Sequence, residues 1–271
     1  LVLQSEAVQR LFLNKLIDVA LTWHQNFPTL PPTSSRFLHC SIHAIKNMRR
    51  KMEDKHVALA EFNQLFGIQD GVERAYYAVF DGHGGVDAAT YAATHLHVAL
   101  SKQETLQSDT ATAFKSAFKH TDDMFKSKAK RERLRSGTTG VIVLIQDHEL
   151  TVAWLGDSQA ILLLGDEDYV LLACDGFFDA VKPSEVPHLV LDALQQPSDP
   201  ESRVDAPLEQ SGHTVGLKIA QQLVGYAKAV GSSDNITVIL VFLRPPEQLL
   251  AHVSTTGTTQ VTQDSASQDS P

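Results

Sequence analysis

Residues 138–176 read TTGVIVLIQDHELTVAWLGDSQAILLLGDEDYVLLACDG, and this stretch decides the fold class. Apolar runs at 138–146, 149–155, 158–164 and 168–174 are separated by short groups of Gly, Asp and Ser. Runs of this length, bounded by turn residues, are typical of β-strands. The connections are too short for crossover helices, so we expect successive strands to pair antiparallel.

The rest of the chain places further strands and helices on both sides of this block. Apolar runs predict strands at 37–43, 75–80 and 235–243. Helical periodicity predicts helices at 85–102, 109–130, 183–196 and 212–230. Because the helices flank a run of antiparallel strands instead of alternating with parallel ones, the predicted class is α+β.

The two ends of the chain differ from its middle. Residues 1–36 predict an N-terminal helical extension, with an amphipathic helix at 3–24, and a proline-rich linker. We expect this helix to pack on the core, and partner binding is the alternative. Residues 245–271, rich in Ser, Thr and Gln, predict a disordered tail. The folded domain is therefore expected at 37–244.

Composition excludes several classes of function. Of the 271 residues 43% are hydrophobic, and the formal net charge is -9. An acidic surface disfavours binding to nucleic acid and to anionic membranes. No apolar run reaches the roughly 18 residues of a membrane span. Two cysteines, Cys40 and Cys174, do not make a disulfide framework, so we expect a reducing compartment, the cytoplasm and also the nucleus. Cys174, in an apolar run, is expected to serve packing.

Acidic residues stand where apolar strands begin or end. Asp81, Asp157 and Asp175 each follow a predicted strand, and Asp234 precedes one. Each alone is ordinary turn chemistry. Together they predict converging carboxylates, because strand ends of one sheet lie near one another. Such carboxylates repel unless a cation lies between them, and hard divalent ions prefer all-oxygen sites.

Several motifs in a fixed order resemble the type 2C family of metal-dependent protein phosphatases. They are RRKMEDKH at 49–56, VFDGHGG at 79–85, SGTT at 136–139, GDS at 156–158, ACDGFFD at 173–179 and SDNIT at 233–237. The resemblance covers 37–244 and implies two packed, mainly antiparallel β-sheets flanked by helices, an αββα sandwich. The stretches SIHAIKN at 41–47 and VFLR at 241–244 resemble the calmodulin-dependent protein kinase phosphatase (partner-of-PIX) subgroup. Members of that subgroup act on calmodulin-dependent and p21-activated kinases.

The resemblance implies a centre of two Mg²⁺ or Mn²⁺ ions. Asp81 matches the carboxylate that bridges both ions, and the carbonyl of Gly82 matches a backbone ligand to one of them. Asp175 and Asp234 match the remaining direct carboxylate ligands.

Four further acids match positions with weaker roles. Glu53 and Asp54 match residues that hold metal-bound waters. Asp157 and Asp179 match a third, weaker metal position.

Two residues match the catalytic positions. Arg49 matches the arginine that binds phosphate, and a planar guanidinium suits two phosphate oxygens. His83 matches a general acid that protonates the leaving Ser or Thr oxygen. The resemblance implies that a metal-activated water attacks the phosphorus, so no covalent phospho-enzyme is expected.

The chain departs from the family pattern between 164 and 168. Family members carry several tens of residues there, including a core strand and a flap beside the active site, and none of this segment is found in the sequence. We therefore expect an incomplete sandwich with exposed strand edges. Two functions follow. One is an active phosphoserine and phosphothreonine hydrolase acting on phosphorylated proteins, protein kinases among them. The other is a catalytically impaired, spliced or truncated form that binds partners.

Overall fold

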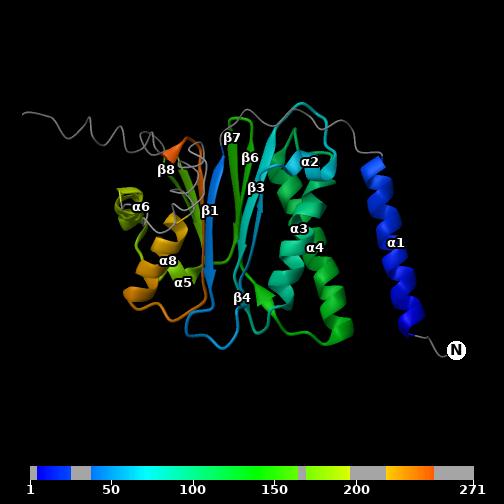
Figure 1. Cartoon of the computed structure of the whole chain (residues 1–271), viewed down its shortest axis with the longest axis horizontal. Coiled ribbons are helices and arrows are strands. Elements are labelled where there is room, and N and C mark those ends of the chain that lie inside the picture. The colour runs from blue at the N-terminus through cyan, green and yellow to red at the C-terminus, as the bar shows by residue number, and fades with distance from the viewer. Residues whose placement is uncertain (1–4, 26–37, 164–168, 196–217, 247–271) are drawn as a thin grey trace, which may run out of the picture.

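The computed structural model describes residues 5–25, 38–163, 169–195 and 218–246 (Figure 1). Its helices are α1 (Ser5–Gln25), α2 (Phe62–Phe66), α3 (Asp87–Ser101), α4 (Thr110–Glu132), α5 (Asp175–Phe178), α6 (Val186–Gln195) and α8 (Ile219–Ala229), with a 3₁₀ turn at Pro183–Glu185. The predicted linker at 26–36, the residues at 212–217 of one predicted helix and most of the predicted tail lie outside the described residues.

Two four-stranded antiparallel sheets form the centre of the fold. One has the order β1 (His39–Ile45), β10 (Ile236–Phe242), β9 (Tyr169–Ala173), β8 (Gln159–Leu163). The other has the order β2 (Lys55–Leu59), β3 (Arg74–Phe80), β6 (Gly140–Gln146), β7 (Glu149–Leu155). Two short strands, β4 (Gly82–His83) and β5 (Gly137–Thr138), pair separately. The predicted α+β class with antiparallel sheets is confirmed.

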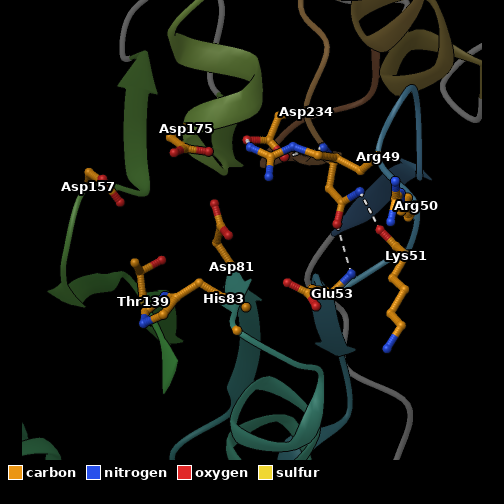
Figure 2. Close-up of a pocket in the computed structure, with 13 residues that line it drawn as sticks. Arg49, Arg50, Lys51, Glu53, Asp81, His83, Thr139, Asp157, Asp175 and Asp234 are labelled. Carbon is orange, nitrogen blue, oxygen red and sulfur yellow. Dashed lines mark hydrogen bonds and ion pairs between the residues drawn. The ribbon is translucent and has the colours of Figure 1, made fainter. Parts of the chain in front are cut away.

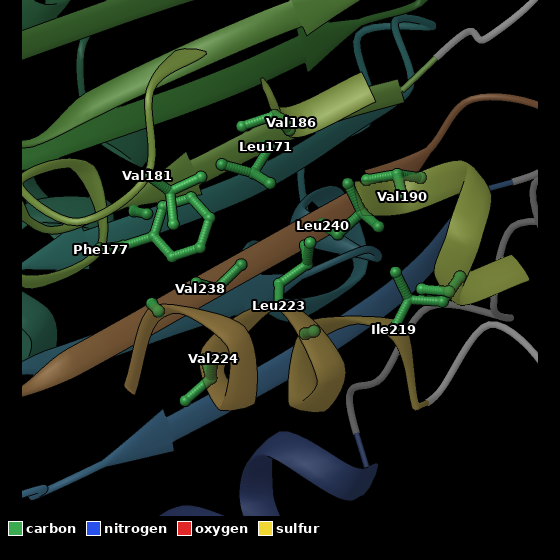
Figure 3. Packing of buried hydrophobic residues seen from close by; sticks show 14 of the residues in the cluster. Leu171, Phe177, Val181, Val186, Val190, Ile219, Leu223, Val224, Val238 and Leu240 are labelled. Carbon is green, nitrogen blue, oxygen red and sulfur yellow. The ribbon is translucent and has the colours of Figure 1, made fainter. Parts of the chain in front are cut away.

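Side-chain alternation along the strands builds three apolar layers. In β3, Tyr77 faces the second sheet, whereas Tyr76 faces the helices α3 and α4. The layer on the other side joins β9 and β10 to α6 and α8, where Leu171, Val238 and Leu223 pack together (Figure 3). Each sheet is thus covered by helices on its outer face and by the other sheet on its inner face (Figure 1).

The two strands that precede 164–168, β7 and β8, each lie at an edge of a sheet. Within the described residues, β8 pairs only with β9, and β7 pairs only with β6. Apolar side chains on these strands are exposed, with Trp154 at 66% and Leu162 at 40% of their maximal area. This is the uncovered apolar surface that loss of a neighbouring strand leaves behind.

The helix α1 corrects one expectation. The sequence predicts that its apolar face packs on the core, but Leu11 is 70% and Phe12 is 66% exposed. Figure 1 shows α1 standing to the side of α3 and α4. Packing on the core is therefore wrong for this structure. Among the described residues, no helix has the length and apolarity that crossing a membrane requires.

Several short elements differ from the sequence prediction. The run at 138–146 is two strands, because Thr139 turns its N–H out of the sheet to the carbonyl of Asp81. The strand β2 and the helix α2 were not predicted. β2 is a five-residue edge strand whose conformation is fixed by pairing with β3.

Candidate metal and phosphate site

Carboxylates from both sheets meet in one acidic pocket (Figure 2). β3 ends directly before Asp81, Cys174 separates β9 from Asp175, and Asn235 separates Asp234 from β10. The pocket has a volume of about 570 Å³ and is lined by Arg49, Arg50, Lys51, Glu53, Asp81, Gly82, His83, Gly84, Thr139, Asp157, Asp175, Asp234 and Asn235. Every predicted site residue except Asp54 and Asp179 is in this lining.

The two exceptions, Asp54 and Asp179, do not line the pocket. Asp54 is 3% exposed, and its Oδ2 accepts a hydrogen bond of 2.6 Å from Thr237 Oγ1. Burial raises the pKa of Asp54, and the charges of Asp234 and Asp175 add to this effect. Asp179 is exposed at the end of α5 and does not line the pocket. Its role at a third metal position stays a prediction.

The electrostatics of the pocket fit divalent cations. Ligand atoms of Asp81, Cys174 and Asp175 all lie within 4.8 Å of one another. Burial, the hydrogen bond with Asp175 and the charge of Asp54 raise the pKa of Asp81 to about 8. A proton and a cation therefore compete for the same oxygens. Crowded carboxylates of this kind are the donors that Mg²⁺ and Mn²⁺ prefer.

Arg49 lies at the mouth of the pocket on the loop between β1 and β2. Its guanidinium forms an ion pair with Asp234, and 60% of its side chain is exposed. Figure 2 shows Arg49 beside Asp234 and His83 beside Thr139, with Asp81 between them and pointing toward Asp175. A phosphate above Asp81 would therefore have a cationic donor on one side and an imidazole on the other.

The position of His83 depends on a glycine. His83 pairs with Gly137 through β4 and β5. A Cβ built on Gly137 would lie 2.3 Å from Nε2 of the His83 ring. Only glycine at 137 leaves room for the ring in this position.

We expect Gly137→Ala to displace His83 at little cost in stability, because the clashing group is the end of a flexible side chain. The substitution should lower kcat to nearly the level of His83→Ala. The double variant should be no worse than His83→Ala, since both changes remove the same interaction. Steady-state kinetics of the three variants measure this, and additive losses would contradict it.

The segment Ser136–Thr139 fixes the backbone around Asp81. The carbonyl of Asp81 accepts hydrogen bonds from Thr139 N and Thr138 Oγ1, both at 2.8 Å. Ser136 Oγ accepts from Ala88 N in the first turn of α3 at 3.1 Å. Thr139 Oγ1 and the buried Ser158 Oγ are 2.8 Å apart. These bonds tie the β3–β4 turn to β5 and to the β7–β8 turn.

Asn235 holds the loop that carries Arg49 and Glu53. It is 5% exposed, and its Oδ1 accepts from Glu53 N at 2.8 Å. Its Nδ2 donates to Lys46 O at 2.9 Å and to Lys51 O at 3.0 Å. One buried amide thus connects the start of β10 to both ends of the β1–β2 loop.

Removing this amide should loosen the β1–β2 loop. Asn235→Ala leaves three backbone groups without their partner, so we expect a loss of about 2–4 kcal/mol in the free energy of unfolding. KM for a phosphorylated substrate should rise with it. Asn63→Ala is the matched control, because Asn63 Nδ2 donates to Val72 O at 2.6 Å away from the pocket. The control should lose stability without a change in KM, and equal KM changes would refute the assignment.

Sequence reasoning missed the neutral residues of the site. Thr237 and Asn235 belong to the SDNIT motif at 233–237, in which only Asp234 is predicted to be a site residue. Cys174 was expected only to pack, but its Sγ accepts from Thr237 N at 3.2 Å and donates to Asn235 O at 3.5 Å. The available signal in the sequence is the polar residue Asn235, which stands directly between Asp234 and an apolar strand.

The fold and the acidic pocket agree with the phosphatase family that the sequence motifs resemble. The chain belongs to the protein phosphatase 2C family, whose model matches residues 38–169 and, separately, residues 163–236. The two matched stretches meet at 163–169, between β8 and β9. This is the position at which the sequence predicts that a central segment of the family is absent.

Curated relatives and solved structures agree with this family. The chain is 42% identical to human protein phosphatase 1F over 316 residues, covering 92% of this chain and 66% of the relative. It is 38% identical to human protein phosphatase 1E over 310 residues, covering 89% of this chain and 39% of the relative. Both alignments are longer than the chain itself, so the relatives hold residues without a counterpart here.

Two solved structures show the same fold at low identity. A sex-determining protein of C. elegans has a TM-score of 0.67 at 21% identity, covering 91% of this chain and 75% of its own. A serine/threonine phosphatase of Mycobacterium tuberculosis has a TM-score of 0.55 at 19% identity, covering 76% of this chain and 99% of its own.

Proposed function

We propose that this chain hydrolyses phosphoserine and phosphothreonine on proteins with two Mg²⁺ or Mn²⁺ ions in the acidic pocket. The observation that carries the proposal is the convergence of Asp81, Asp175 and Asp234 beneath Arg49. Burial, the hydrogen bond with Asp175 and the neighbouring negative charges raise the pKa of Asp81 to about 8. A cation removes this repulsion, and an arginine at the mouth supplies affinity for a phosphoryl group.

The residues that would hold the ions come from different elements. Asp81, the carbonyl of Gly82, Asp175 and Asp234 are the proposed direct ligands, and Asp157 stands at the pocket edge for a third position. Glu53 and Asp54 would orient waters from below. When bound, the ions would activate a water for attack on phosphorus and neutralise charge on the phosphoryl oxygens.

The chain's own residues provide binding and proton transfer. Arg49 can donate two hydrogen bonds to two phosphoryl oxygens, which fixes the orientation of the group. Doing so requires Arg49 to leave its ion pair with Asp234. His83, which lines the pocket on the other side of Asp81, would donate a proton to the leaving Ser or Thr oxygen.

We propose phosphorylated protein kinases as the substrates. The resemblance of the stretches at 41–47 and 241–244 to the calmodulin-dependent protein kinase phosphatase subgroup supports this assignment. We also propose a signalling role in the cytoplasm, extending to the nucleus. Cys40 and Cys174 are both free, which suits a reducing compartment.

The test is phosphate release from a phosphoserine peptide with and without millimolar Mn²⁺. The wild-type chain should require the ion, and Asp81→Asn and Asp234→Asn should each lower kcat/KM at least about 100-fold, as expected when transition-state contacts are lost. Asp123→Asn is the control, because Asp123 is an exposed acid on α4 paired with Lys119. Turnover that survives in Asp81→Asn would overturn the proposal.

The second candidate function is partner binding without turnover. It is favoured by the division of the family match into two stretches at 163–169 and by the apolar side chains exposed on β7 and β8. A folded chain that binds Mn²⁺ and a phosphopeptide but releases no phosphate would establish it.

A further inference from the structure

A second hollow, mainly apolar, adjoins the acidic pocket. It has a volume of about 440 Å³ and lies between α3, α4 and the strands β5 and β7. Its apolar lining includes Phe80, Tyr91, Leu96, Phe118, Phe125 and Leu155. We call this hollow the apolar groove. Its volume falls within the roughly 300–1,000 Å³ of ligand pockets, at the end suited to one or two side chains.

The groove and the acidic pocket share part of their walls. His83 and Thr139 line both of them. The proposed leaving oxygen of the substrate would lie at His83. Substrate residues next to the phosphorylated one would therefore lie over the groove. The groove is therefore continuous with the place where the substrate must bind.

The charges on the rim of the groove compensate each other. Asp122 and Lys126, one turn apart on α4, form an ion pair. The rim thus offers no strong attraction to a charged side chain of the substrate, and the lining favours an apolar one.

We propose that the apolar groove binds a large apolar side chain of the phosphoprotein substrate, close in sequence to the phosphorylated residue. This inference rests on the proposed function and names the substrate class more narrowly. Burial of one Leu or Phe side chain in such a groove is expected to favour binding by at least about tenfold.

The experiment uses phosphoserine peptides in an alanine background, each with one Leu at a different position within four residues of the phosphoserine. Binding is followed by fluorescence anisotropy and turnover by phosphate release, both with Mn²⁺. Hydrolysis of the all-alanine peptide, which has no large apolar side chain, reports on the acidic pocket alone. We expect one Leu position to strengthen binding about tenfold over the all-alanine peptide.

Three variants assign the effect to the groove. Leu155→Asn and Ala129→Glu alter its lining and should each reduce the preference to about twofold or less. Trp154→Asn is the control, because Trp154 neighbours Leu155, is 66% exposed and lies outside the lining. It should keep the full preference. Hydrolysis of the all-alanine peptide should be the same in all three variants and the wild type.

The outcomes separate this inference from the proposed function. Hydrolysis of the all-alanine peptide with no preference for Leu at any position overturns the inference and leaves the function intact. A binding preference that is lost in Leu155→Asn, without any hydrolysis, supports the groove and overturns the function. A preference that appears only after Phe12→Gln and Leu16→Gln would show that α1 fills the groove in the wild-type chain. The occupant would then be α1 and not the substrate, which would also overturn the inference.

Discussion

Asp81→Asn is expected to abolish turnover and at the same time to stabilise the cation-free protein at pH 8. Burial and neighbouring acids raise the pKa of Asp81 to about 8, so the folded state holds this proton more tightly than the unfolded chain does. Between the ordinary carboxyl pKa, near 4, and pH 8, the free energy of unfolding therefore falls as pH rises. An asparagine does not titrate and removes this loss.

The expected gain follows from the pKa shift and the partial exposure of Asp81. After allowance for solvent screening it is on the order of 2 kcal/mol at pH 8. In a chain of this size it should raise Tm by about 5 °C in a chelator. Added Mn²⁺ should raise Tm of the wild type but not of Asp81→Asn, because the negative charge of a proposed ligand is lost.

The matched control is Asp123→Asn. The hydrogen bond from Lys119 lowers the pKa of Asp123, so its replacement brings no such gain. Thermal unfolding at pH 5 and pH 8, in a chelator, measures both variants. A lower Tm for Asp81→Asn at pH 8 would mean that the carboxylates do not converge as the structure shows.

Gly176→Ala is expected to cause the largest loss of stability. A Cβ at 176 would lie 2.0 Å from the backbone oxygen of Asn235 and 3.1 Å from Asp234 Cβ. Neither backbone can retreat easily, because Gly176 O accepts from Ser232 Oγ at 2.7 Å and Cys174 N donates to Thr237 O at 3.3 Å. The substitution forces α5 away from β10, and with it Asp175 away from Asp234.

We expect Gly176→Ala to cost about 3 kcal/mol or more, the upper end for overpacking. Mn²⁺ should no longer stabilise the protein. The control is Gly225→Ala on α8, where nothing lies within 4 Å of the added Cβ. That change should be neutral or stabilising by up to about 1 kcal/mol, since alanine favours helix. Urea unfolding compares the two, and a loss of under about 1 kcal/mol for Gly176→Ala would refute the close contact.

Much of the fold was predictable because its strands carry their own signal. The runs at 75–80, 149–155 and 235–243 alternate or bury apolar side chains, and the structure has β3, β7 and β10 there. The position of Asp81, Asp175 and Asp234 at strand ends predicted their convergence, since β3 and β9 end where β10 begins. β2 escaped prediction because Lys55–Leu59 has a weak pattern and takes its conformation from β3.

By itself the sequence determined most of the strands and longer helices and which acids stand at their ends, because both follow from local periodicity and from residue type. Only the tertiary structure decided how those acids differ. It buried Asp54 against Thr237, 183 residues away in sequence, and left Asp179 outside the pocket. It also placed Asn235 under the β1–β2 loop and the apolar groove beside His83. Burial and contacts between distant residues depend on how the two sheets stack, and no local pattern contains that information.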